Sequence, residues 1–394
     1  MHGVDAGCIP IEQPTGFGMN RKIACLGAAV PPSLMSADGL FANHATSLRK
    51  FAPARRAKYA IRKTLRRSPP PYNFRAVKRL GEAVERDELE RLAGCRLRLS
   101  FEDIVNHPRL PAARRAYLES FCEVYEGDPF LVRLLLQAGR FFVFHTAAVL
   151  EAAQDPSRRE TWFTVAALKQ QLAVFGYASA RQVDHLLARL YEVGFMEQSR
   201  APGDKRVRLL ATTDKLRSHH TEWLAAHYVP LARLYPDHDY SPVLSRNRVF
   251  HVLHCRACLP FTAVGARLMM TLPDTMLFFA HAAGPLIQNG LLKAAMDAGD
   301  PTAAVSYMDV ADRYGVSRTH VRNLMNSAQS AGLVNIVGRG GRSIEILPRH
   351  WASYDRGLAV GMYLHDVVNL VAMREWTKGQ GDGAARSLAS MGAD

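Results

Sequence analysis

The chain has 394 residues, of which 48% are hydrophobic, and a formal net charge of +14 at pH 7. Its length predicts two or three domains with ample material for a packed interior, and its charge favours an anionic partner such as nucleic acid or a membrane surface. The six scattered cysteines argue against a disulfide-built secreted protein. The lack of an uninterrupted run of about 18 apolar residues argues against a membrane span.

The N-terminal part of the chain is basic and has no sustained hydrophobic period. Residues 1–48 contain scattered Gly, Pro and Ser and are expected to form a disordered leader. Between Arg49 and Arg79 there are twelve Lys or Arg residues and no Asp or Glu. This basic arm, residues 49–79, is either a flexible segment that wraps phosphates or a solvated, partly helical face.

Helical patterns dominate the remaining sequence. Apolar residues recur at helical spacing over residues 80–155, which we expect to form a helical region. A first structural unit with a long following helix is expected at 156–235, and a second unit with flanking helices at 262–376. Turn-rich residues predict a linker at 236–261, and Gly- and Ala-rich residues predict a flexible tail at 377–394.

One helical pattern occurs twice in the chain, 138 residues apart. Ser179 corresponds to Ser317 (317 − 179) and Gly194 corresponds to Gly332 (332 − 194), with no gap between them. A shared register over a whole helix indicates one structural unit used twice. The two copies agree at packing positions and differ at outward positions, which suggests that one chain reads two different sequences.

The second copy has the pattern of a winged helix-turn-helix. Ser306 and Ser317 are good N-caps for two helices joined by the turn Gly315-Val316. Two strand-like runs then flank the basic tip Gly338–Arg342. The second helix has one apolar stripe, formed by Val321, Leu324, Met325 and Ala328. The first copy supplies the same parts, with Thr164 as a cap and a tip at residues 200–208. We therefore expect a mainly α fold with small β-hairpin wings: two winged helix-turn-helix units flanked by long helices.

The first copy resembles the MarR family of bacterial transcriptional regulators. The resemblance rests on Ser179–Phe195, on the wing Gly203-Asp204-Lys205-Arg206, and on the following Leu209–Thr213. It implies that Asp204 orients Arg206 for entry into the minor groove, and that the helix at 214–235 helps to form a dimer. The chain departs from the family in a longer turn before Ser179. The second copy lacks the wing Asp and offers Arg339 and Arg342 instead.

A winged helix-turn-helix suits duplex DNA, because its second helix fits the major groove and its hairpin tip reaches a neighbouring groove or the backbone. The candidate DNA-binding residues are the outward and tip residues of both copies: Ser179, Arg181, Gln182, His185, Arg189, Lys205, Arg206, Ser317, Arg318, Thr319, Arg322, Asn323, Arg339 and Arg342.

Three histidine-containing segments are candidates for other sites. The segment His251–Cys258 is the one ligand-like cluster, but no second spaced pair accompanies it, so a half-buried helix turn is favoured over zinc. His220 and His227 lie seven residues apart on one helical face, where they either line an effector pocket or pack between the halves. The same two readings apply to His350-Trp351. Motifs for hydrolysis, phosphate loops and dinucleotide binding are missing, so we expect no enzyme, no cofactor and no metal.

These observations predict a sequence-specific, double-stranded DNA-binding transcriptional regulator of bacterial type, cytoplasmic and associated with the nucleoid. A single chain would act as a pseudo-dimer whose two units read adjacent major grooves. A small-molecule effector and a further homodimer remain open. The alternatives are a plasmid-type replication initiator, which also carries two winged units, and a winged-helix module that binds proteins.

Overall fold

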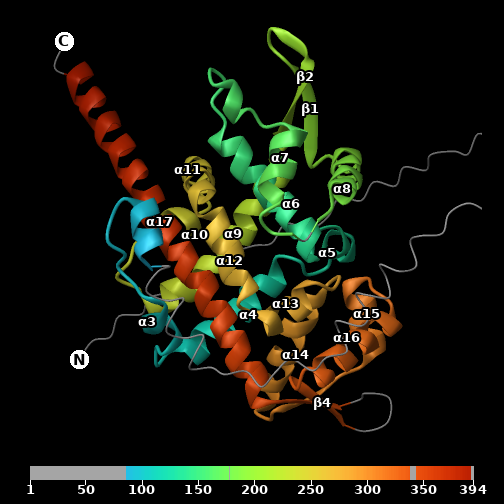
Figure 1. Cartoon of the computed structure of the whole chain (residues 1–394). Coiled ribbons are helices and arrows are strands. Elements are labelled where there is room, and N and C mark those ends of the chain that lie inside the picture. The colour runs from blue at the N-terminus through green and yellow to red at the C-terminus, as the bar shows by residue number, and fades with distance from the viewer. Residues whose placement is uncertain (1–85, 177, 338–342, 392–394) are drawn as a thin grey trace, which may run out of the picture. The chain divides into compact units, whose positions relative to one another are not determined.

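The described chain is mainly helical, as the sequence predicts, and has two small antiparallel sheets (Figure 1). The computed structural model describes residues 86–176, 178–337 and 343–391, with side chains up to residue 379. The predicted leader (1–48) and basic arm (49–79) therefore lie outside the described residues.

Helices fill the region before the first copy of the repeat. A helix covers residues 86–93, and it is followed by α3 (Phe101–Val105), α4 (Leu110–Glu123), α5 (Pro129–Leu135) and α6 (Ala138–Ala153). α3 begins with a capping box between Ser100 and Asp103, and Asp128 caps α5. The apolar run in α6 is buried, so the predicted helical region is confirmed for the described residues.

The first copy consists of two helices, a hairpin and a long helix. These are α7 (Val165–Leu172), α8 (Ala180–Glu192), β1 (Met196–Ala201), β2 (Asp204–Thr212) and α9 (Asp214–Leu234). Thr164 and Ser179 cap α7 and α8, as predicted, because their side-chain oxygens accept hydrogen bonds from the exposed backbone N–H groups of the first turn.

The second copy repeats this order of elements and has one additional strand, β3, before them. It contains β3 (Thr302–Ala304), α15 (Tyr307–Tyr314), α16 (Arg318–Ser330), β4 (Val334–Val337), β5 (Ser343–Ile346) and α17 (Pro348–Met391). Both α8 and α16 begin and end 138 residues apart. The backbone repeats as well, because the Phe195 N–H donates to the Leu190 carbonyl and the Leu333 N–H donates to the Ala328 carbonyl. The duplication predicted from the sequence is therefore present in the hydrogen bonding.

The described chain has a first half, up to residue 235, and a second half, from residue 236 onward, and the helices of the two halves interlock. In the first half α4 packs along α9, and in the second half α11 (Arg248–Cys258) packs along α17. α4 also contacts α14 (Gly284–Ala298) of the second half, α11 contacts α6 of the first half, and α9 contacts α17. One continuous hydrophobic core runs through both halves. The two copies are thus joined by helices rather than connected through a flexible segment.

The predicted linker at 236–261 is wrong. This segment forms α10 (Ser241–Leu244), α11 and a short 3-10 helix at Leu259–Phe261. Phe250 and Cys255 are fully buried, and Arg256 Nε donates to the carbonyl of Ala152 on α6. The polar and turn-forming residues at 236–248 suggested a loop, but the apolar face of α11 is part of the contact between the halves.

The prediction of a flexible tail from residue 377 onward is also wrong for the described residues, because the helix α17 does not end there. α17 continues through Met391 in the backbone, and residues 392–394 lie outside the described part. Gly- and Ala-rich composition suggested a tail, yet Ala is the best helix former and offsets part of the cost of the glycines. Residues 262–298 are helical as predicted, with α12 (Thr262–Met270) and α13 (Pro273–Phe279) preceding α14.

A buried ion pair ties the N-terminal region to α17. The Arg98 guanidinium lies 2.6 Å from Asp366 Oδ1, whose side chain is 2% exposed, and the Tyr240 hydroxyl donates to the same oxygen at 2.6 Å. Arg98→Met is expected to lower the free energy of unfolding by about 3–5 kcal/mol, because it leaves a buried carboxylate without its cation. Urea unfolding measures this loss.

The matched control for Arg98→Met is Arg115→Met. Arg115 pairs with Asp297 at 2.6 Å, but both side chains are 40% or more exposed. Its loss is expected to lower the free energy of unfolding far less than the loss of Arg98 does, because solvent screens an exposed ion pair. Equal effects of the two substitutions would contradict a structural role for the Arg98–Asp366 pair.

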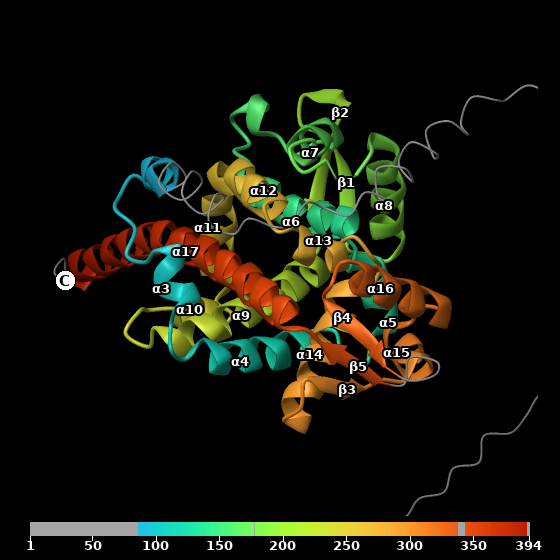
Figure 2. The ribbon, with the colours of Figure 1, turned by 60° about the horizontal axis from the view of Figure 1, so that its bottom comes forward.

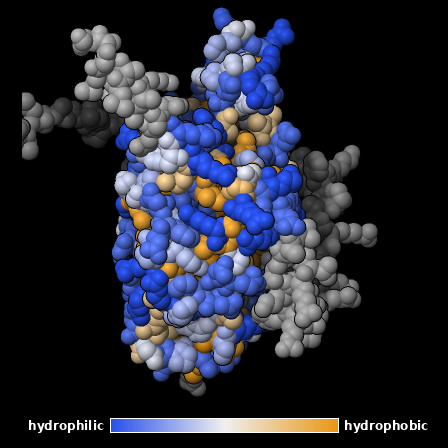
Figure 3. All heavy atoms as spheres, turned by 90° about the vertical axis from the view of Figure 1, so that its left-hand side faces the viewer, coloured by the Kyte–Doolittle hydropathy of each residue, from blue (hydrophilic) through white to orange (hydrophobic). Residues whose placement is uncertain are grey.

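One described stretch, Arg248–Met270, is long and apolar enough to cross a membrane by length and composition alone. The pair α5 and α6, bent by 86°, passes the same test if it is counted as one span. Core helices of soluble proteins also pass this test, and α11, α12 and α6 all contribute buried side chains to the common core. The face drawn in Figure 3 is mainly hydrophilic, with hydrophobic residues scattered through its middle.

Candidate nucleic-acid interface

The outward face of α8 carries the polar residues singled out in the first copy. Arg181, Gln182, His185 and Arg189 are exposed, whereas the opposite face is buried in the core. Ser179 and Gln182 form a reciprocal capping box: the Gln182 N–H donates to Ser179 Oγ, and the Ser179 N–H donates to Gln182 Oε1. These two side chains therefore use part of their hydrogen-bonding capacity to begin the helix.

A basic cleft of about 510 Å³ lies between α8 and the α5–α6 corner. Gln182, His185 and Arg189 line it from α8, and Arg133 and Arg140 line it from the other side. None of the described residues that line this cleft is Asp or Glu. Arg189 pairs with Glu192 at 2.7 Å, and its guanidinium lies 5.4 Å from the centre of the Phe130 ring. Such a cleft suits an anion.

Arg133 and Arg140 were missed by the sequence analysis. They lie outside both copies of the repeat, and no motif marks them. Only the turn between α5 and α6 brings them to α8, and α5 also contacts α15 of the second copy. There Pro129 and Arg133 lie against Gly315, where an added Cβ would come within 3.3 Å of both residues.

The outward face of α16 is also exposed to solvent. Ser317, Arg318, Thr319, Arg322 and Asn323 are exposed. A cleft of about 710 Å³ separates the first turns of α15 and α16, and it is lined by Ser306, Asp309, Arg318, Thr319 and Arg322 among others. Because both helices point their N-termini toward it, the backbone N–H groups add positive potential to that of the arginines.

His320 is different from its neighbours on α16. Its Nε2 lies 2.9 Å from the Ala282 carbonyl, and its ring is partly buried against the α13–α14 turn. It therefore fixes the position of α16 instead of facing outward. Its counterpart in the first copy, Gln182, has no such contact with a neighbouring helix among the described hydrogen bonds.

The hairpin of the first copy presents Lys205 and Arg206 at its tip, and both are exposed. The resemblance to the MarR family implies that Asp204 orients the side chain of Arg206. In the described residues, the Asp204 carboxylate contacts the backbone of Arg206 and not its guanidinium. The carboxylate accepts from the Arg206 backbone N–H at 3.1 Å and pairs with Arg159 at 2.9 Å. Arg159 precedes the first copy, so the pairing was hidden from the sequence. Arg339 and Arg342 of the second hairpin lie outside the described residues.

Both views of the ribbon place these elements in one order: the β1–β2 hairpin, α8, α16 and the β4–β5 hairpin (Figures 1 and 2). The structure therefore brings the helices α8 and α16 to the same side of the described residues, between the two hairpins. Their order follows from the interlocked long helices, which position each copy against the other.

Of the histidines singled out in the sequence, His220 and His350 are buried and His227 is partly buried in helix packing. His227 contacts the Tyr117 hydroxyl at 3.0 Å, and His350 lies within 3.0 Å of Gln288 and stacks on Phe278. Burial lowers the pKa of both histidines to about 4. His220 faces His251 and Cys255 on α11.

A cavity of about 360 Å³ lies between helices of both halves. Its walls are mainly aromatic and aliphatic, with some neutral polar residues, and none of the described residues that line it is Asp, Glu, Lys or Arg. His145, Trp223 and Thr275 line it, and each has a buried polar atom without a hydrogen-bond partner: His145 Nδ1, Trp223 Nε1 and Thr275 Oγ1. His227 also lines this cavity. The two predicted roles of His227, pocket lining and packing, thus coincide.

Comparison with known proteins adds nothing to this geometry. No protein-family model, no curated protein and no solved structure matches the chain. The MarR-like reading accordingly remains a prediction that rests on the residues Ser179–Thr213 themselves.

Proposed function

We propose that the protein is a double-stranded DNA-binding transcriptional regulator, and that its two repeats are winged helix-turn-helix units in a single-chain pseudo-dimer. The observation that carries the proposal is the pair of exposed, arginine-bearing helix faces on α8 and α16, two helices that lie on one side of the interlocked halves (Figures 1 and 2). Helices of this kind read base edges in the major groove, and basic clefts beside them bind phosphates.

The packing between the copies supports the pseudo-dimer. Dimeric regulators place two recognition helices in successive major grooves about one helical turn apart. Here α4, α9, α11 and α17 cross between the halves in the way that the dimer helices of two chains would. Because the outward residues of α8 and α16 differ, the two units would read unlike half-sites.

The central cavity supports regulation by a small molecule. Its charge-free aromatic wall fits a neutral, flat ligand, and the unpartnered Trp223 Nε1 offers it a hydrogen-bond donor. Since α6, α9 and α17 all line the cavity and all flank the repeats, a bound ligand would change the distance between the two recognition helices.

The test uses the full chain. Footprinting of genomic fragments should show one protected site with two adjacent, dissimilar halves, and the affinity should fall steeply with salt. Binding to directly repeated sites with local melting would instead support a replication initiator. Failure to bind any duplex at low salt would support the protein-interaction module.

A further inference from the structure

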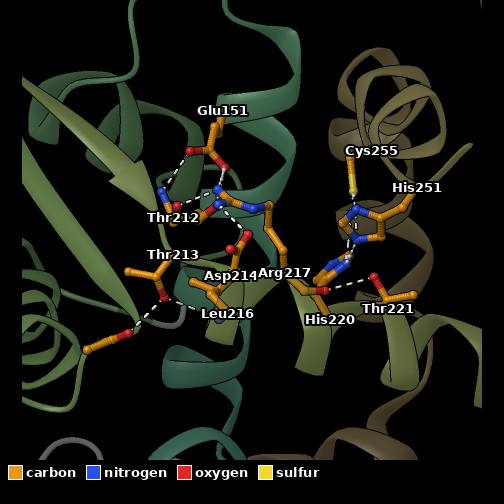
Figure 4. A network of polar contacts seen from close by, with 11 residues as sticks. Glu151, Thr212, Thr213, Asp214, Leu216, Arg217, His220, Thr221, His251 and Cys255 are labelled. Atoms are coloured by element: carbon orange, nitrogen blue, oxygen red, sulfur yellow. Dashed lines mark hydrogen bonds and ion pairs between the residues drawn. The ribbon is translucent and has the colours of Figure 1, made fainter. Parts of the chain in front are cut away.

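Three buried side chains from two helices converge in a way that the sequence did not predict. His220 on α9 points toward His251 and Cys255 on α11 (Figure 4). His220 Nδ1 lies 2.8 Å from His251 Nε2, and Cys255 Sγ lies 3.6 Å from the same nitrogen and 3.9 Å from His220 Nδ1. All three donor atoms fall within 4.8 Å of one another.

The local sequence accounts for two of these three residues. His251 and Cys255 are four residues apart on α11, so they share one helical face. The third residue, His220, lies on α9, 31 residues before His251 in the sequence. Its side chain contacts the same side of α11. No second spaced pair of ligand residues accompanies His251–Cys258 in the sequence, so the sequence alone predicts no metal site there. Exposure is 4% for His220, 7% for His251 and 1% for Cys255.

The donor set has a definite chemical preference. Two imidazole nitrogens and one sulfur, without a carboxylate among them, suit Zn²⁺ and similar ions rather than Ca²⁺ or Mg²⁺. Burial lowers the pKa of His251 to about 4 and that of His220 well below its ordinary value, so both rings are neutral and hold a free lone pair at pH 7. Burial also raises the pKa of the Cys255 thiol.

We propose that His220, His251 and Cys255 bind one divalent transition-metal ion, Zn²⁺ being the best match, with a fourth position left for water. On binding, the Cys255 S–H bond breaks, an S–metal bond forms and the proton passes to solvent. The hydrogen bond between the two imidazoles requires a proton on one of the two facing nitrogens. That proton moves, by exchange with solvent, to the other nitrogen of the same ring, and each facing nitrogen then forms a bond to the metal.

This site lies one helical turn from contacts that reach the first hairpin. Arg217, three residues before His220, donates to the carbonyl oxygen of Thr212 at the end of β2 and lies 3.5 Å from Glu151 on α6 (Figure 4). The Thr212 N–H in turn donates to Glu151 at 2.7 Å. An ion that joins α9 to α11 would therefore set the position of β2. This consequence rests on the proposed function, whereas the site itself does not.

Titration of the full, metal-free chain with Co²⁺ tests the site directly. We expect one ion per chain and a near-ultraviolet thiolate-to-cobalt charge-transfer band that Zn²⁺ abolishes by displacement. Cys255→Ser should lose the band, and His220→Gln should weaken binding at least about tenfold. The control is Cys258→Ser, which removes another cysteine of α11 that is not among the three donors. Loss of the band in the control, or its persistence in Cys255→Ser, would overturn the proposal.

Thermal unfolding provides a second measurement that does not depend on the band. Zn²⁺ should raise the unfolding temperature of the wild type and of Cys258→Ser but not that of His220→Gln. An equal rise in all three would overturn the site. A change in DNA affinity on adding Zn²⁺ supports the link to the hairpin, and unchanged affinity with normal Co²⁺ binding refutes that link alone. A chain that binds Co²⁺ but no DNA would refute the proposed function and leave the site standing.

Discussion

Lowering the pH from 7 to 5 is expected to unfold the protein, because its core contains histidines that are buried in the neutral form. His220, His254 and His350 are at most 4% exposed. Burial lowers the pKa of His254 to about 3 and that of His350 to about 4, and it holds that of His220 well below its ordinary value of 6.5. A proton added to any of them would place an unsolvated charge inside the core.

The sign of the effect follows from the direction of these pKa shifts. Below pH 6.5 the unfolded chain binds protons that the folded chain does not, so the free energy of unfolding falls as the pH falls from about 6.5 toward 4. At pH 5 each such histidine costs about 2 kcal/mol. His254 and His350 together remove about 4 kcal/mol, and His220 adds to this loss, which is a large part of the whole stability of a typical domain, about 5–15 kcal/mol.

Urea unfolding followed by circular dichroism between pH 7.5 and 5 measures this loss. His254→Gln should reduce the pH dependence by about 1.4 kcal/mol per pH unit, the value for one proton. The exposed His185→Gln is the matched control and should leave the dependence unchanged. A denaturation midpoint that stays constant between pH 7.5 and 5.5 would contradict neutral burial of these histidines.

Local patterns were sufficient to predict the repeated units but not what lies between them. The caps Thr164, Ser179 and Ser317 and the buried stripe of α16 depend only on neighbours within a few residues, and all are confirmed. The segment at 236–261 was misread because its helical apolar face is balanced by polar residues. Its burial depends on α6 and α17, which are far away in the sequence.

The candidate sites show the same difference between local patterns, which the sequence reveals, and tertiary contacts, which it does not. Outward residues of α8 and α16 were found because helical periodicity separates the two faces of one helix. Arg133, Arg140 and the contact of His220 with α11 were not found, because each depends on a tertiary contact between elements with no shared motif. The Asp204 carboxylate likewise pairs with the guanidinium of Arg159, 45 residues before it, and contacts Arg206 through the backbone N–H.

Replacing Arg318 and Arg322 together by alanine is expected to weaken specific DNA binding by about 2–6 kcal/mol, since each arginine that contacts a base contributes about 1–3 kcal/mol. Both residues are exposed and line the cleft between the first turns of α15 and α16. Fluorescence anisotropy with the footprinted duplex measures the loss. The matched control is Arg313→Ala, which removes a charge from α15 that pairs with Glu126 at 3.1 Å and is absent from that cleft.

The same double variant distinguishes a pseudo-dimer from a chain that uses only one unit. If α8 and α16 read different half-sites, the variant should lose protection and sequence preference in one half of the footprint and keep both in the other half, since the first copy is untouched. Equal loss in both halves would show that the two helices do not read separate sequences. An unchanged footprint would remove α16 from the interface. Because the interlocked helices hold the two copies in one body, the surviving half-site should also keep its position relative to the lost one.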